Sequence, residues 1–330
     1  MQSLIKNNVT KSEEFLLEAI RHRKSLRIKI LTDLYYSIGD DAAFKISKSN
    51  KVADIVAYAL KKTKIDLPNY WILEYEKTRK RISSYMEELD RIAALLSKNN
   101  ITIVALKNTG ICRGLYRVPG ASPMGDLDVL VDIDNFEKAH TLLLKDGYVF
   151  KFRSELEEED IKKAKISGGA EYLATLKDGN KMWFELQWRP VAGRWIQQHQ
   201  EPSSSDLILR SKRINGSRIR ILSPEDNLLQ VCLHTAKHSY VRSPGFRLHT
   251  DVDRILNETK IDWKLFIEQV ERLEVRTACY FSLYLANILL GTKVPCNVLK
   301  KLSPNKSKCI ILLFWLNKVG LFNPDSKKWG

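Results

Sequence analysis

The stretch PMGDLDVLVD, at residues 123–132, places two carboxylates directly before a run of large apolar residues. Its alternation predicts a strand whose apolar side chains face the core. Asp126 and Asp128 then project together from the opposite face, about 7 Å apart along the chain. An unpaired ionised carboxylate is costly to bury, so the pair indicates either an open strand end or a bound cation.

A third carboxylate is expected on a neighbouring strand. The turn residues 177–180 separate EYLATL from KMWFELQW, which predicts a β-hairpin. Glu185 lies within its second, apolar strand and needs a compensating partner. Carboxylate oxygens are the ligands that Mg²⁺ prefers, and two such ions can assist an in-line phosphoryl displacement. Asp126, Asp128 and Glu185 are therefore a candidate metal site for Mg²⁺ or Mn²⁺, although a D-x-D pair alone is also common at strand ends.

Three segments carry a family resemblance. They are ALKNTGICRGLYRVPGASPMGDLDVLVDI (105–133), FELQW (184–188) and LSPEDNLLQVCLHTAKHSYVRSPGFRLHTDVDRIL (222–256). In motif order and spacing the chain resembles the uncharacterised nucleotidyltransferase family of the polymerase-beta-like superfamily. The likeness covers about residues 101–256.

The resemblance implies a Mg-dependent enzyme that transfers a nucleoside monophosphate, with AMP expected, from an NTP to a hydroxyl or similar acceptor and releases pyrophosphate. It assigns Asp126, Asp128 and Glu185 as metal-binding catalytic carboxylates. The implied nucleotide-binding residues are Lys107, Thr109, Gly110 and Gly125. Lys107 would neutralise phosphate charge, and the backbone amides of Thr109 and Gly110 would cradle the triphosphate at a helix start.

Three residues depart from the family pattern. Asn108 replaces a glycine, Ser122 replaces an arginine, and Gln187 replaces a histidine. None of them is one of the three carboxylates, so activity is expected. The loss of the arginine leaves open a catalytically degenerate nucleotide-binding or scaffold protein.

A second group of polar residues lies near the C-terminal side of the likeness. His234 and His238 stand four apart, which places them on one helix face. They are candidates for zinc ligands, for buried packing residues, or for contacts with nucleotide or substrate. For a zinc site, the sequence does not fix a third ligand. The candidate substrate or nucleotide contacts are His234, Lys237, His238, Arg247 and Asp251.

Composition limits the partners. The net charge of +15 favours anionic partners, but the basic residues are spread along the chain and mixed with acids. ATP is the expected NTP, and a small-molecule acceptor is favoured over RNA or protein; a toxin-type enzyme acting on RNA or protein is the alternative. Five cysteines without a CxxC pair, and no apolar signal segment, predict a cytoplasmic protein with no membrane partner.

The order of patterns predicts an α+β fold: a small mixed-sheet core at 101–222 between helical regions at 1–100 and 223–330. Apolar residues at helical spacing predict helices over 13–30 and 70–97. The apolar run 309–316 predicts a buried C-terminal helix. Further predicted elements are strands at 101–107, 126–131, 148–152 and 218–222, and helices at 109–116 and 135–145.

Overall fold

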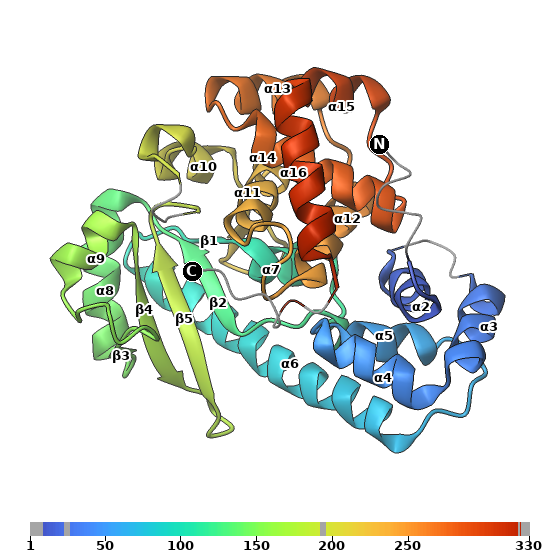
Figure 1. Cartoon of the computed structure of the whole chain (residues 1–330). Helices are drawn as coiled ribbons and strands as arrows, with labels where there is room; N and C mark the ends of the chain where they lie inside the picture. Colours follow the sequence, from blue (N-terminus) through green and yellow to red (C-terminus); the bar gives the residue numbers. More distant parts are fainter. Residues whose placement is uncertain (1–8, 23–26, 192–195, 323, 325–330) are drawn as a thin grey trace.

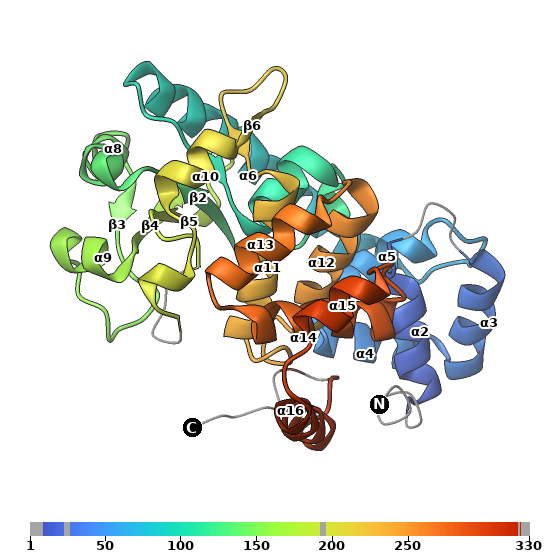
Figure 2. The same ribbon diagram turned by 90° about the horizontal axis from the view of Figure 1, so that it is seen from above.

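The computed structural model describes residues 9–22, 27–191, 196–322 and 324. It is an α+β structure in which helices flank one mixed sheet, as predicted (Figure 1). The sheet lies to one side of the long helix α6, and the C-terminal helices lie beside the sheet (Figures 1 and 2).

Within the described residues the sheet has seven strands in the order β3-β4-β5-β2-β1-β7-β6. β2 pairs in parallel with β5 and antiparallel with β1, which brings the predicted D-x-D strand beside the predicted glutamate strand. The bounds are β1 Val104–Ala105, β2 Asp126–Leu130, β3 Val149–Phe150, β4 Gly169–Thr175, β5 Lys181–Gln187, β6 Lys212–Arg213 and β7 Arg220–Ile221.

The helices account for most of the rest. The α-helices are α2 Lys11–Ile20, α3 Ile28–Ile38, α4 Asp40–Ser49, α5 Ala53–Leu60, α6 Asn69–Lys98, α7 Lys107–Gly110, α8 Phe136–Lys145, α9 Ile161–Ser167, α10 Ser204–Arg210, α11 Pro224–Lys237, α12 Phe246–Glu258, α13 Trp263–Arg272, α14 Arg276–Leu285, α15 Cys296–Leu302 and α16 Lys306–Val319. Short π-helical turns follow α7 at Ile111–Leu115 and α14 at Ala286–Leu290, and 3₁₀ turns lie at Pro119–Ala121, Ile133–Asn135 and Gln198–Gln200.

The predicted single helix over 13–30 is wrong. Thr10 and Glu13 cap the start of α2 reciprocally, but the chain leaves the helix after Ile20. The amide of His22 donates to Asp253 Oδ2 at 2.8 Å, so this turn is fixed by a C-terminal helix far away in sequence. Helix then resumes at Ile28.

The C-terminal apolar run is helical, but the prediction that it is buried is wrong for one face. Leu313 and Leu316 are buried, whereas Ile310, Ile311 and Phe314 are 64%, 66% and 69% exposed. α16 lies at the surface, where a helix packs through one face alone (Figure 2).

Two buried clusters meet at α6. Its N-terminal part contributes Trp71 to a core shared by the N- and C-terminal helices, which includes Phe15 and Phe281. Further along, Leu89 packs in the core beneath the sheet with Phe184. With 30 residues, α6 is about 45 Å long and joins both cores. The division of the chain at residues 100 and 222 stays a prediction.

Candidate active site

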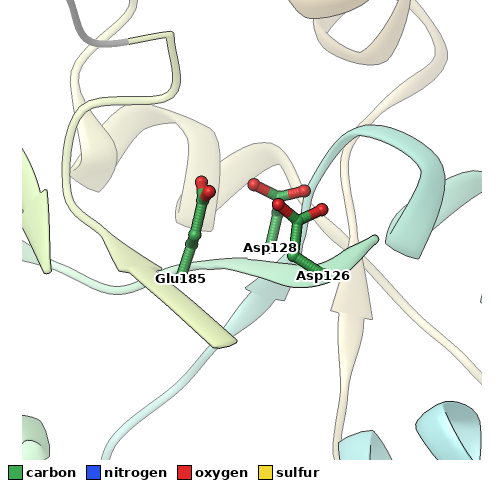
Figure 3. A group of neighbouring side chains, drawn as sticks. All are labelled: Asp126, Asp128 and Glu185. Carbon is green, nitrogen blue, oxygen red and sulfur yellow. The ribbon is translucent and has the colours of Figure 1, made fainter. Parts of the chain in front are cut away.

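The three predicted carboxylates come together on one face of the sheet. Asp128 on β2 lies directly opposite Glu185 on β5, and Asp126 precedes it by two residues on the same strand face. Ligand oxygens of Asp126, Asp128 and Glu185 lie within 4.8 Å of one another. All three side chains point to the same side of the sheet (Figure 3). The arrangement has the oxygen donors and the spacing that a divalent cation needs.

Lys107 provides a positive charge from outside the two strands. Its Nζ donates to Asp128 Oδ1 at 2.5 Å and to Glu185 Oε2 at 3.4 Å. Burial raises the pKa of Asp128, and the Lys107 charge opposes that rise. Gln187 Nε2 donates to Glu185 Oε2 at 2.5 Å, so the residue that replaces the family histidine orients the third carboxylate by hydrogen bonding.

A second cation, Arg153, was missed at the sequence level. It follows β3 and donates from Nη1 to Asp126 Oδ2 at 2.6 Å and from Nη2 to Glu185. Its Nη2 also donates to Glu171 Oε1 at 3.0 Å. Burial lowers the pKa of Arg153, but the bonds with Glu171 and Asp126 outweigh that effect and raise it. No local pattern around residue 153 indicates this role, because Arg153 reaches the site only through the pairing of β3 with β4.

Glu171 is a fourth carboxylate on the same face. It lies on β4, directly opposite Glu185. The hairpin turn at 177–180 fixes that register, so counting outward from the turn would have paired the two residues. Glu171 binds Arg153 through both carboxylate oxygens and is not one of the three clustered metal-ligand candidates.

The turn that carries Lys107 is tied to the aspartate strand. The helix starts at Lys107 rather than at Thr109, and Lys107 has a φ of 49°, a strained conformation for a non-glycine residue. Its amide donates to Gln230 Oε1 at 2.9 Å. The Thr109 hydroxyl accepts from the amide of Asp128 at 3.0 Å, which fixes the strand and the turn relative to each other.

The expected phosphate-binding role of the Gly110 amide stays a prediction. That amide donates to the carbonyl of Leu106 at 3.0 Å and is therefore engaged within the turn. Gly110 also allows close packing, because a Cβ there would lie 2.7 Å from the carbonyl oxygen of Ala105. Gly125, just before β2, has open space where its Cβ would be.

The two glycines make a matched test of this packing. We expect Gly110→Ala to lower the free energy of unfolding by about 1–3 kcal/mol, since backbone atoms of β1 would have to move. Gly125→Ala should change it by less than about 0.5 kcal/mol. Urea unfolding of both variants measures the difference; equal stabilities would show that α7 and β1 are not packed as described.

The predicted histidines lie beside Lys107. The rings of His234 and His238 meet edge to face, with centroids 4.8 Å apart. Burial, followed by the charge of Lys107, lowers the pKa of His234 well below its usual value. Burial and the charge of Lys237 lower the pKa of His238 to about 4, so both rings are neutral near pH 7. In the described part of the chain no third metal-ligating side chain joins them, which leaves the zinc alternative without support.

Lys237 donates from Nζ to the carbonyl of Val191 at 3.2 Å. Partial removal from water and the Lys107 charge lower the pKa of Lys237 to about 8. Asp251, on α12, is buried; burial raises its pKa to about 6 against the charges of Arg254 and Arg247 and the influence of nearby Asn108. Asn108, which replaces the family glycine, is itself buried.

The third departure has a local role. Ser122 is buried, and its hydroxyl donates to the carbonyl of Val118 at 2.9 Å, which closes the loop before the aspartate strand. Arg254 Nη2 donates to the carbonyl of the neighbouring Ala121 at 2.6 Å, so α12 holds this loop as well.

A family model described as uncharacterised nucleotidyltransferase matches residues 37–291, more than half of the chain. The chain belongs to this family. It is therefore a nucleotidyltransferase, with an acidic cluster of the kind that could hold a divalent metal. A search of curated proteins finds no match. Among the described helices, none combines the length and apolar character required to cross a bilayer.

Proposed function

We propose that this nucleotidyltransferase transfers a nucleoside monophosphate from a Mg²⁺–NTP complex to an acceptor hydroxyl and releases pyrophosphate. The observation that carries the proposal is the convergence of Asp126, Asp128 and Glu185 from two neighbouring strands. Their side chains fit a divalent cation, because they supply only oxygen donors and lie within 4.8 Å of one another.

The three carboxylates would hold Mg²⁺ (or Mn²⁺), which would activate the attacking oxygen and stabilise the leaving one. Lys107, which lies against Asp128 and Glu185, would neutralise the charge of a polyphosphate bound beside the cluster. Thr109 positions Asp128, because its hydroxyl accepts a hydrogen bond from the backbone amide of Asp128, and Gln187 orients Glu185. These residues supply positioning and charge, the main contributions to catalysis for a loose phosphoryl-transfer transition state.

The proposal extends to ATP as the NTP, AMP as the transferred group and a small hydroxylated molecule as the acceptor. The residues proposed to line the nucleotide or acceptor side are His234, Lys237, His238, Arg247 and Asp251. The closeness of His234 and Lys237 to Lys107 supports this placement. The net charge of +15 supports RNA or protein as a second class of acceptor.

Labelled ATP tests the reaction type. With acceptor pools of small hydroxylated metabolites, RNA or protein, label from α-labelled ATP should enter product. Label from γ-labelled ATP should leave as pyrophosphate. Removal of divalent metal with EDTA should stop both, and Mg²⁺ or Mn²⁺ should restore them. Transfer of the γ-label to product would contradict the proposal, as would binding of ATP with no turnover on any acceptor class.

A further inference from the structure

Arg153 contacts carboxylates of the cluster that a metal ion would use. Its two terminal nitrogens donate to Asp126 and Glu185, which are two of the three candidate metal ligands, and to Glu171. The guanidinium also lies over the ring of Trp183, 5.5 Å from its centroid. One side chain thus bridges three carboxylates from three adjacent strands, β2, β5 and β4.

We propose that Arg153 is a stand-in for the metal ion. Its guanidinium neutralises the carboxylate cluster before substrate arrives and leaves the cluster when the metal binds. The inference rests on the proposed function. Asp126, Asp128, Glu185 and Glu171 bring four negative charges to one sheet face, and Lys107 and Arg153 offset two of them. Arg153 donates to the same carboxylate groups that would coordinate the ion, so the ion and the guanidinium compete for them.

Arg153 is better suited to leave than Lys107. Its side chain is 37% exposed, whereas that of Lys107 is 12% exposed. It also stands at the start of the exposed acidic segment 153–160, which connects β3 to α9. Lys107, in contrast, is part of a turn held by Gln230 and packed against β1. A charge on an exposed segment moves away from its partners at a lower cost in desolvation and packing.

Metal affinity tests the competition directly. Binding of Mn²⁺ alone to the full chain is followed by electron paramagnetic resonance for the wild type and Arg153→Met, which removes the charge and keeps the apolar stem. We expect Arg153→Met to bind Mn²⁺ about fivefold more tightly or better, the factor that corresponds to roughly 1 kcal/mol of lost competition. The matched control is Arg79→Met, which removes one positive charge from an exposed pair with Glu76 on α6 and should change the affinity less than twofold.

Thermal unfolding supplies a second readout. Without metal, Arg153→Met should unfold at a lower temperature than the wild type, because its carboxylates repel one another. Mn²⁺ should raise its midpoint by more than that of the wild type. Arg153→Gln serves as a second variant if the methionine protein does not fold.

The outcomes separate the two proposals. Equal or weaker Mn²⁺ binding by folded Arg153 variants, with clear binding by the wild type, would overturn the stand-in role and leave the proposed function in place. Mn²⁺ binding by neither protein above the level of an Asp126→Asn/Asp128→Asn control would overturn the proposed function and this inference together.

Discussion

Replacing Asp126 and Asp128 together by asparagine is expected to lower NMP transfer at least about 1,000-fold. Several kcal/mol of transition-state stabilisation come from a metal ion that these carboxylates would hold, and each 1.36 kcal/mol is a factor of ten in rate. Asparagine keeps the size of each side chain and removes both negative charges. The cluster then retains Glu185 with the cations Lys107 and Arg153 beside it, which no longer favours a divalent ion.

The measurement is transfer of α-labelled ATP at saturating Mg²⁺, with the circular dichroism spectrum and a cooperative thermal transition as evidence of folding. Glu171→Gln is the matched control, since it removes a carboxylate from the same sheet face that is not among the clustered ligands. We expect it to retain transfer within about threefold. Transfer by the folded double variant at a rate near that of the wild type would refute the assignment of the aspartates.

Lys107→Met is expected to lower kcat/KM for the NTP by about 100-fold, the loss that follows removal of a single strong electrostatic contact in a phosphoryl-transfer site. Methionine keeps the apolar stem, so the change tests the ammonium group. Two hydrogen bonds still hold the turn in this variant. One runs from the backbone amide of residue 107 to Gln230, and the other from the amide of Asp128 to the Thr109 hydroxyl. Lys107→Arg should not restore activity fully, because a guanidinium has a different shape from the compact ammonium.

Metal binding distinguishes this variant from the aspartate one. Lys107 lies against Asp128 and Glu185, so its removal leaves the carboxylates free to bind Mn²⁺. We expect unchanged or tighter Mn²⁺ binding together with the loss of transfer. Lys181→Met, at the far end of β5, removes an equal charge and should leave both properties unchanged. Unaltered kcat/KM in Lys107→Met would show that Lys107 does not contact the nucleotide.

The carboxylate cluster could be predicted from the sequence because strand geometry is local. Alternation along 126–130 fixes which side chains share a face, and the turn at 177–180 fixes the hairpin register. What alternation does not specify is which strands are neighbours. The parallel pairing of β2 with β5, which brings Glu185 opposite Asp128, is a tertiary decision. From the sequence, only the family resemblance indicates that link.

Several features lay beyond the local pattern. The end of α2 depends on a hydrogen bond between His22 and Asp253, 231 positions apart. The surface position of α16 depends on how much apolar area the other helices leave available for packing. The apolar run alone does not give that area, which is why the burial predicted for it is wrong at Ile310 and Phe314. Asn108 replaces the family glycine, and it is buried close to Asp251 of α12, which lies far away in the sequence.

The sequence by itself determined the α+β class, the face of the aspartate strand that carries the two carboxylates, and the candidate acids, since side-chain alternation and turn chemistry act over a few residues. Only the tertiary structure decided what neutralises those acids. Lys107 and Arg153 come from segments on either side of the aspartate strand and approach the cluster through strand pairing and helix packing. A positive charge acts through distance in space rather than position along the chain, so no local pattern could have named Arg153.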